Sequence, residues 1–392
     1  MPQRIDDICP RPERLPPQPT SPLVPPIHLA AVYQCRDPQQ ADELLSGEVD
    51  GYVYQRDRQP NADLLAEKCR ELHGAERAAI ASSGMAALAA ALLSQLEHGD
   101  HLIVSNQLYG RSLNLLVAEA RRLGIDSSVV DTCDVAATEA ACAKRTRLIV
   151  VETITNPLLR VSDLRALADV AHRHDARLLV DNTFAGPALC RPIELGADLV
   201  MESLTKTMNG HSDVILGLLC GSAAAWQRVP GVLSTWGLAS APFECWLAQR
   251  GLGTLALRSE RACANARQVA EFLAGHEHEK VEAVYYPGLA HHPDHALAQR
   301  QFGQRCGTIV TFTLPGGRTA AESFMTASGI PFCPSLGDLC TTLSHPESTS
   351  HRGLTAADRA ALGIEGGTIR LSVGIESSEQ ILDQVSRGLE KS

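Results

Sequence analysis

A lysine and two acids that follow apolar runs are the residues of this chain whose spacing could support joint chemistry. Residues 148–151 and 178–180 are short apolar runs, and each ends in an acid, Glu152 or Asp181. Such runs predict buried parallel strands. Lys206 follows 25 residues after the second acid, with two hydroxyl side chains shortly before it. Ligands of open α/β sheets bind at the carboxyl ends of the strands, so we expect these groups to meet there.

This combination suits one cofactor, pyridoxal phosphate. A lysine amine can form a Schiff base with it, and a buried aspartate can keep the pyridine nitrogen protonated so that the ring withdraws electrons. Lys206 and Asp181 are the candidates for these roles. Each has a plainer interpretation when taken alone, a surface lysine and a helix cap, and agreement with other parts of the chain favours the cofactor.

Two further segments could hold a phosphate group. Ser83-Gly84-Met85 leads into an Ala-rich run that predicts a helix, whose first amides are free to bind an anion. Tyr54 and Arg56 would share one face of an extended segment, where a hydroxyl and a guanidinium also suit a phosphate. An ordinary capped helix and a surface Tyr-x-Arg pair are the alternatives.

Two more side chains could contact a cofactor or its substrate. Tyr109 lies in the loop after a strand predicted at residues 101–105 and could stack flat on an aromatic ring. Arg370 lies between apolar residues of a predicted strand, residues 368–373, and suits a bidentate clamp on a carboxylate. The alternative for Arg370 is the solvent face of an edge strand.

The organisation of the chain follows from its length and its local patterns. A chain of 392 residues exceeds what one core usually holds, so we expect more than one domain. Residues 1–26 contain nine of the 22 prolines, which predicts an extended N-terminal arm. Asn61 and Gly74 are the predicted cap and end of the next helix. We predict an α/β fold with an arm over residues 1–52, a large, mostly parallel sheet domain over 53–250 and a smaller α/β domain over 251–392.

Composition argues for a small-molecule enzyme rather than a binder of nucleic acid or membrane. The net charge is −10, and the sequence has no basic patch. Twelve cysteines lie scattered without a C-x-x-C pair, which predicts reduced thiols and no metal site. No apolar run approaches the length of a membrane span, so we expect a cytoplasmic protein.

The motifs together resemble the trans-sulfuration enzymes of Cys and Met metabolism, the family of cystathionine γ-lyase, cystathionine β-lyase, cystathionine γ-synthase and methionine γ-lyase. The resemblance extends from about Pro22 to the end of the chain. The matching pieces are Pro25-Pro26-Ile27, Tyr54-x-Arg56, Ser83-Gly84-Met85, Tyr109-Gly110, Glu152-x-x-x-Asn156-Pro157, Asp181-Asn182-Thr183, Ser203-x-Thr205-Lys206, Asn209-Gly210-His211, Ser335-Leu336-Gly337 and Arg370-x-x-x-x-x-Glu376.

This resemblance implies an aspartate-aminotransferase-like fold (fold type I) with a seven-stranded sheet. It also implies that Lys206 carries pyridoxal 5'-phosphate, that Asp181 contacts the ring nitrogen and that Tyr109 stacks on the ring. The other cofactor-binding residues it implies are Tyr54, Arg56, Ser83, Gly84, Met85, Thr183, Ser203 and Thr205. The substrate-binding residues it implies are Asn156, Ser335, Leu336 and Arg370. Tyr54 and Arg56 would come from the neighbouring subunit of a homotetramer, a dimer of dimers with shared active sites.

The implied activity is carbon-sulfur lysis of the cystathionine γ-lyase kind, which yields a thiol, ammonia and a 2-oxo acid. A γ-replacement transferase of the cystathionine γ-synthase or homoserine-ester sulfhydrylase kind, or a cystathionine β-lyase, would use the same residues. The family's usual Tyr-Gly-Gly-Thr is Tyr109-Gly110-Arg111-Ser112 here, and this loop lacks the Cys that many methionine γ-lyases carry in it, which argues against that activity. Pro334 stands where γ-lyases often have Glu, and Glu202 stands where the family commonly has His.

Overall fold

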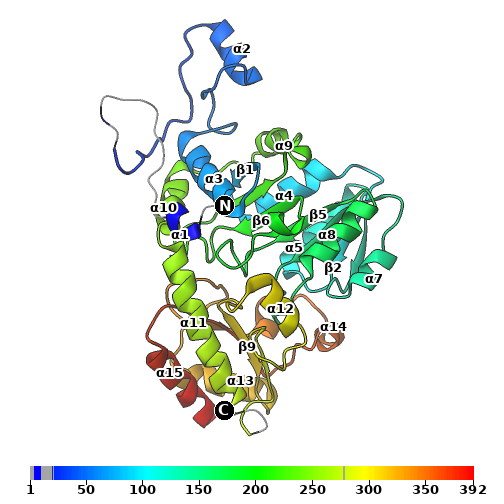
Figure 1. Cartoon of the computed structure of the whole chain (residues 1–392), viewed down its shortest axis with the longest axis vertical. Helices are drawn as coiled ribbons and strands as arrows, with labels where there is room; N and C mark the ends of the chain where they lie inside the picture. The colour runs from blue at the N-terminus through cyan, green and yellow to red at the C-terminus, as the bar shows by residue number, and fades with distance from the viewer. Residues whose placement is uncertain (1–3, 10–19, 21, 277–278) are drawn as a thin grey trace.

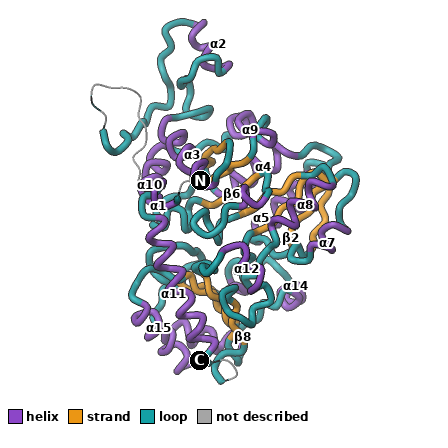
Figure 2. Tube along the Cα trace, viewed as in Figure 1, coloured by secondary structure: helices purple, strands orange, loops and turns teal. Residues whose placement is uncertain are grey.

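Two layered units make up the described chain, which comprises residues 4–9, 20, 22–276 and 279–392 of a computed structural model. The larger unit contains a mostly parallel sheet, and the smaller unit contains a second sheet near the C-terminus (Figure 1). Helix α11 (Leu255–Ala274) leaves the larger unit and runs along the smaller one. The strands form two separate groups, each flanked by helices (Figure 2).

The larger sheet has seven strands within the described residues, in the order β1-β7-β6-β5-β4-β2-β3. Neighbours from β3 to β6 are parallel, whereas β7 is antiparallel to both β6 and β1. The strands are β1 (Arg77–Ala81), β2 (His101–Ser105), β3 (Asp126–Val130), β4 (Thr146–Glu152), β5 (Arg177–Asp181), β6 (Leu199–Ser203) and β7 (Gly217–Gly221). The predicted mostly parallel sheet is confirmed, and β4, β5 and β6 end at one edge.

Both faces of this sheet are buried. Successive residues of a strand point to opposite faces, so Ile149 and Val151 pack in one hydrophobic cluster while Leu148 and Val150 pack in another. Burial on both sides explains why these strands are continuous apolar runs in the sequence. The helices of this unit are α3 (Pro60–His73), α4 (Gly84–Gln95), α5 (Gly110–Asn114), α6 (Ala120–Arg122), α7 (Val135–Ala140), α8 (Leu164–Arg173), α9 (Val229–Thr235) and α10 (Pro242–Leu252).

The smaller sheet is antiparallel and has the order β10-β11-β9-β8 in the described chain. Its elements are β8 (Ala283–Tyr285), β9 (Ile309–Thr313), β10 (Thr342–Ser344) and β11 (Thr368–Ser372), with α12 (His295–Phe302), α13 (Gly317–Ser328), α14 (Ala356–Ala361) and α15 (Ser378–Lys391). Strand β11 is an inner strand and Arg370 is 5% exposed, so the edge-strand alternative for this residue is wrong. Among the described helices, none has the length and hydropathy to cross a membrane.

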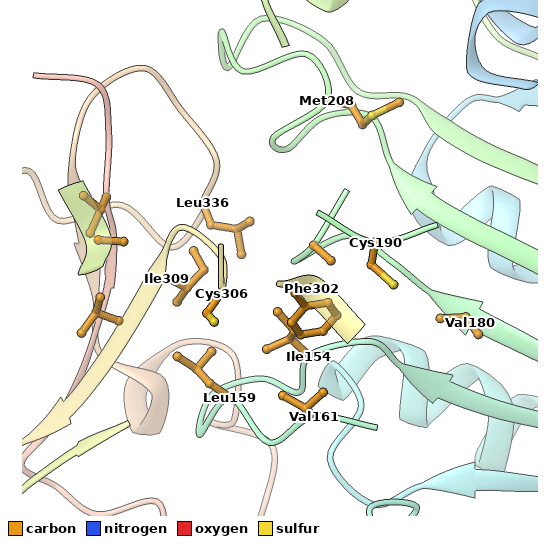
Figure 3. Packing of buried hydrophobic residues seen from close by; sticks show 14 of the residues in the cluster. Ile154, Leu159, Val161, Val180, Cys190, Met208, Phe302, Cys306, Ile309 and Leu336 are labelled. Atoms are coloured by element: carbon orange, nitrogen blue, oxygen red, sulfur yellow. The ribbon is translucent and has the colours of Figure 1, made fainter. Parts of the chain in front are cut away.

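A hydrophobic cluster continues from the larger unit into the smaller one (Figure 3). Ile154 and Val161 lie just beyond β4 in the larger unit, and Cys306, Ile309 and Leu336 belong to the smaller unit. A shared core of this kind holds the two units together, because separating them would expose apolar surface to water. Loops of the smaller unit therefore face the carboxyl edge of the larger sheet.

The N-terminal arm is partly helical, although its prolines predict an extended segment. Ile5–Ile8 form α1 and Pro38–Ser46 form α2, which projects from the body of the molecule (Figure 1). Ile8 and Cys9 are buried in the main hydrophobic cluster, so apolar packing decides the conformation there. Much of the predicted extended tail, residues 1–3, 10–19 and 21, lies outside the described residues.

The start of α3 also differs from the prediction. Gln59 is the N-cap, and its side chain accepts a hydrogen bond from Asn61 N at 2.9 Å. The side chain of Asn61 instead holds the arm: Oδ1 accepts from His28 N at 2.8 Å and Nδ2 donates to Pro26 O at 2.9 Å. Gly74 ends the helix in the left-handed conformation, φ 64°, as predicted.

Candidate active site

A cavity of about 410 Å³ lies between the carboxyl edge of the larger sheet and loops of the smaller unit. Its volume falls in the range of roughly 300–1,000 Å³ that is usual for small-molecule sites. The predicted site residues that line it are Ser83, Gly84, Met85, Tyr109, Asn156, Asp181, Thr183, Ser203, Thr205, Lys206, Ser335, Leu336 and Arg370. The fold thus brings together residues spread over most of the sequence.

Lys206 lies in a turn directly after β6. Its backbone N donates to Ser203 O at 3.1 Å, and Gly210 N donates to Lys206 O at 2.8 Å, which fixes the turn. Its Nζ donates to Ser335 Oγ of the smaller unit at 2.7 Å. Burial, and secondarily the positive charge of Arg370, lower the pKa of the Lys206 amine. The amine therefore loses its proton more readily than a surface lysine does.

Asp181 ends β5 with its carboxylate in the cavity. Its Oδ1 accepts from Thr183 N at 3.0 Å and from Thr183 Oγ1 at 2.5 Å, which fixes its orientation. Thr183 Oγ1 also accepts from Ser203 N at 3.0 Å, so the ends of β5 and β6 are joined. Burial raises the pKa of Asp181 to about 6, against the lowering effect of these hydrogen bonds. A cation placed beside this carboxylate would favour its ionised form.

The start of α4 has the features of an anion site. Ser83 caps the helix by accepting from Ala86 N at 3.0 Å, and Gly84 and Met85 begin it with free amides. A Cβ built on Gly84 would lie 2.9 Å from Ser203 Cβ, so a larger residue would close the space between α4 and β6. Thr205 Oγ1 accepts from Leu216 N at 3.2 Å on the same side of the cavity.

Arg370 is a buried guanidinium with a free donor. Nη1 donates to Asn156 Oδ1 at 2.8 Å and Nη2 donates to Ser335 O at 3.2 Å, whereas Nε has no partner within the described chain. The ring of Phe184 lies 5.7 Å from its Cζ. Burial lowers the pKa of Arg370 to about 10, and Glu152 counteracts that effect. A buried, unpaired donor on a residue that lines a cavity suits an anionic ligand group.

Glu152 organises the cavity floor, although the sequence motif assigned it no role. It accepts from Tyr109 N at 2.8 Å and from Asn156 N at 3.1 Å, and so links the loops that carry both residues. Burial raises its pKa well above the usual range, and the charge of Asp181 acts in the same direction. Its position at a strand end was the available signal.

Tyr54 and Arg56 do not line this cavity. Tyr54 is 42% exposed, and the guanidinium of Arg56 lies 5.0 Å from the centre of its ring. Both precede α3 on the segment that joins the arm to the larger unit. The structure of one chain thus assembles the predicted site except for these two residues.

Sequence motifs missed several other lining residues. Ile154 and Phe184 follow the ends of β4 and β5, and this position is the signal that could have found them. Thr349 and Ser350 come from the segment after β10, and only the folded chain places it near Gly110. The lining residues outside the predicted set are Ser112, Glu152, Ile154, Phe184, Met201, Ile215, Pro334, Thr349 and Ser350.

Comparisons with known proteins define the class. The family model described as "Cys/Met metabolism PLP-dependent enzyme" matches residues 11–390. An L-methionine gamma-lyase of Porphyromonas gingivalis is 39% identical over 94% of this chain and 92% of its own. An O-succinylhomoserine sulfhydrylase of Pseudomonas aeruginosa is 39% identical over 91% of this chain and 88% of its own. A crystal structure of cystathionine gamma synthase from Xanthomonas oryzae pv. oryzae in complex with cystathionine has a TM-score of 0.92 at 37% identity, covering 100% of this chain and 98% of that chain.

The chain therefore belongs to the pyridoxal-phosphate-dependent enzymes of Cys and Met metabolism, and the expected fold class is confirmed. The cavity fits the cofactor on observations independent of the family. Helix α4 offers the amides of its first turn at Gly84 and Met85, and Lys206 offers an amine of lowered pKa. Asp181 offers a partly buried carboxylate on whose pKa no cation of the described residues acts.

Proposed function

We propose that this enzyme is a carbon-sulfur lyase of trans-sulfuration that acts on a cystathionine-type amino acid by γ-elimination. The products would be a thiol, ammonia and a 2-oxo acid. The observation that carries the proposal is one cavity that contains Lys206, Asp181 and Arg370 with its unpaired Nε. These groups supply an amine, an anion and a cation, which are the charges that the cofactor and an amino-acid substrate require.

The cofactor would be held at two ends. The amides of Gly84 and Met85, with the hydroxyls of Ser203 and Thr205, would bind its phosphate. Asp181, oriented by Thr183, would accept a hydrogen bond from the ring nitrogen. Tyr109 would stack on the ring, and its backbone is already fixed by Glu152. These residues would hold the cofactor at its phosphate and its ring nitrogen, in the cavity that Lys206 also lines.

The substrate carboxylate would bind to Arg370. Its Nε is free, and Asn156 and Ser335 hold the other two guanidinium nitrogens in place. Leu336 and Pro334 lie beside Ser335 and would contact the substrate side chain. Because Ser335 also accepts from Lys206 Nζ, carboxylate binding and the position of the amine are coupled.

When bound, pyridoxal phosphate draws electrons from the Cα atom of the amino acid through its protonated ring. Lys206 Nζ would accept the proton from Cα, a step for which its lowered pKa suits it. Lys206 would deliver this proton to the C4′ atom of the bound cofactor and, neutral again, would accept a proton from Cβ. Tyr109 would assist the departing group. Asp181 would keep the proton on the ring nitrogen throughout.

γ-Replacement on an activated homoserine ester is the second candidate. A sulfhydrylase that uses O-succinylhomoserine is as similar to this chain as a methionine γ-lyase, and cystathionine γ-synthases share its fold at a TM-score of 0.92. The two reactions differ in whether a thiol captures the intermediate. β-Elimination of cystathionine would use the same groups. The loop of Arg111 lacks the Cys that would favour methionine γ-lyase activity. Relatives named L-methionine gamma-lyase are nevertheless among the similar proteins.

One experiment separates these reactions. The purified holoenzyme is incubated in turn with cystathionine, homocysteine, methionine and acylated homoserines, with and without an added thiol, and the products are identified. We expect cysteine, ammonia and a 2-oxo acid from cystathionine without added thiol. Turnover of an acylated homoserine only when a thiol is present would instead establish γ-replacement. Release of homocysteine would establish β-elimination.

We also propose a homotetramer, a dimer of dimers in which Tyr54 and Arg56 complete the cofactor site of a neighbouring copy. The support is that both residues are exposed and lie outside their own cavity. The arm nearby exposes Leu23, Leu29 and Val32 at 76%, 71% and 67%, more apolar surface than a free arm should show.

The burial of thiols among apolar residues supports a location in the reducing cytoplasm.

Subunit complementation tests the shared site. Lys206→Ala and Arg56→Ala enzymes should each be crippled, and co-refolded mixtures should regain up to about a quarter of wild-type activity. Half of the dimers are then hybrids, and each hybrid has one intact site of two. Absence of recovery in mixtures shown by mass spectrometry to contain hybrids would mean that each site is built within one chain.

A further inference from the structure

A buried carboxyl group and a buried imidazole face each other behind the cavity. Glu202 is 1% exposed and His73 is 0% exposed, and Glu202 Oε1 lies 3.3 Å from His73 Nε2. Neither residue lines the cavity, and no step of the proposed mechanism uses them. Two titratable groups kept so far from water require an explanation.

The alternation of β6 places Glu202 on the far side of the sheet. Its neighbours Met201 and Ser203 line the cavity, so Glu202 points to the opposite face. His73 is the last residue of α3, which covers that face. Asn182, directly after Asp181, points the same way as Glu202, and its Nδ2 donates to Glu202 Oε1 at 2.7 Å.

Few charged groups lie near Glu202 and His73. Glu202 interacts with the nearby thiols of Cys190 and Cys220, and both ring nitrogens of His73 lack a hydrogen-bond partner among the described residues. The charged groups that act on the pair are Asp181 and Arg191. Burial raises the pKa of Glu202 well above its usual range and lowers the pKa of His73 to about 3.

We propose that Glu202 is a positioning residue that remains a neutral carboxylic acid, with its proton placed against the neutral ring of His73. Glu202 Oε1 faces both Asn182 Nδ2 and His73 Nε2, and the hydroxyl oxygen of a carboxylic acid can accept from an amide while it donates to an imidazole. The pair thereby avoids the cost of burying two charges. It also leaves Asp181 as the one ionised acid at the end of β5, so no second anion competes for the ring nitrogen.

The positioning acts through Asn182. Its Oδ1 accepts from Thr153 Oγ1 at 2.7 Å, and its Nδ2 donates to Cys190 O at 3.0 Å as well as to Glu202. Asn182 thus ties β4, β6 and the loop after β5 together, next to Asp181 and Thr183. A change at Glu202 would release one of these ties and let the carboxylate of Asp181 shift.

Two single variants of the holoenzyme test the protonation state. Glu202→Gln keeps a neutral side chain of the same shape whose oxygen can still accept from Asn182, so we expect an unchanged Tm and a kcat within about twofold of wild type. Glu202→Ala should lower kcat about 10-fold to 100-fold with little change in KM, because Asp181 is no longer held in place. The pH dependence of cofactor absorbance should shift in Glu202→Ala alone.

The exchanged pair is a matched control. Glu202→His alone places two imidazoles together and should lower both Tm and kcat, and His73→Glu alone places two carboxyl groups together with the same result. The double variant restores one acid and one imidazole, and should recover most of both losses. This recovery distinguishes a specific pair from general sensitivity of the site to substitution.

Difference infrared spectra give a readout that does not depend on turnover. The wild type should show a protonated-carboxyl stretch that Glu202→Gln lacks, in the cofactor-free protein as well as in the holoenzyme. This proposal rests on the proposed role of Asp181 only for its kinetic part; the infrared and Tm results stand without it.

A fall in the kcat and Tm of Glu202→Gln to those of Glu202→Ala, or the absence of the protonated-carboxyl band, would establish an ion pair and overturn the proposal. Normal kcat in Glu202→Ala would overturn the positioning role.

Discussion

Two buried arginines differ in their hydrogen bonds: one uses all three guanidinium nitrogens within the chain, and the other leaves one nitrogen unpaired. This difference distinguishes a structural arginine from one that could bind a ligand. Arg258, on α11, uses all its nitrogens: Nε donates to Thr254 Oγ1, and Nη1 and Nη2 donate to the carbonyls of Thr207, Met208 and Gly251 at 2.8 to 3.0 Å. Arg370, on β11, keeps Nε unpaired beside the cavity. Burial lowers the pKa of each to about 10.

Burial or pKa alone would not tell these residues apart, whereas the count of satisfied donors does. A guanidinium whose three nitrogens all donate to the chain has little capacity left for a ligand, and it acts as a clamp between segments. Arg258 joins the turn after Lys206 to the junction of α10 and α11. A buried donor without a partner costs free energy unless a ligand pairs with it. The same distinction applies to Lys206 and Asp181, which retain free bonding capacity in the cavity.

The largest effect should come from Lys206→Ala. Its Nζ makes one hydrogen bond in the described chain, to Ser335, so its removal should leave the fold intact. Turnover should fall by a factor of about 10³ or more, because the amine that we propose moves the proton is lost. Borohydride treatment followed by peptide mapping should place the cofactor on Lys206 in the wild type only. A labelled lysine elsewhere would show that the assignment of the amine is wrong.

Arg370→Ala should mainly weaken substrate binding. Loss of a charged donor pair to a carboxylate should raise KM about 100-fold, with a smaller change in kcat. Steady-state kinetics with cystathionine and with its decarboxylated analogue measure this effect. The KM for the analogue should not change with the substitution, because the analogue has no carboxylate at that position. An equal loss with both compounds would mean that Arg370 acts on the fold rather than on the carboxylate.

Arg258→Met should give the reverse pattern. Three backbone carbonyls lose their donor, so the free energy of unfolding should fall by about 3 kcal/mol while KM remains near wild type. Urea unfolding and kinetics on one preparation check both parts. Arg258→Lys keeps the charge but only part of the bonding, and should fall between the two proteins. If the rise in KM, expressed as a free energy, exceeded the loss in the free energy of unfolding, Arg258 would act on substrate binding as Arg370 is expected to do.

The smallest effect concerns pH and Asp181. In the cofactor-free protein burial raises the pKa of Asp181 to about 6, above the value of roughly 3.9 in an unfolded chain. Between these two values the folded state binds more protons than the unfolded state. The free energy of unfolding should therefore fall as pH rises through this window, and the loss should be complete above about pH 6.

Asp181→Asn should flatten that pH dependence, as measured by urea unfolding of the cofactor-free protein at a series of pH values. Some slope should remain, because burial also raises the pKa of Glu152. An unchanged slope would show that Asp181 already ionises in the folded protein near its usual pKa, which would make it as well satisfied as Arg258.

Local patterns in the sequence predicted the central strands and many of the residues that line the cavity. The apolar runs before Glu152 and Asp181 predicted β4 and β5, because a strand buried on both faces has no polar alternation to obscure it. The turn at Ser83-Gly84 predicted the start of α4. Asn61 misled the cap assignment, because Asn is a good cap in isolation while its actual partners, Pro26 and His28, are more than 30 residues away.

The sequence by itself determined which residues we propose for the chemistry, since Lys206, Asp181 and Arg370 each stand out against their neighbours by type. Only the tertiary structure decided which charged side chains keep unpaired hydrogen-bonding atoms that a ligand could use. Gly210 adopts φ 75° and its missing Cβ leaves room for Arg258, and no local rule predicts that contact across nearly 50 residues. Pairing between distant segments sets how many donors of each guanidinium are used, and so distinguishes Arg258 from Arg370, the residue proposed to bind the substrate.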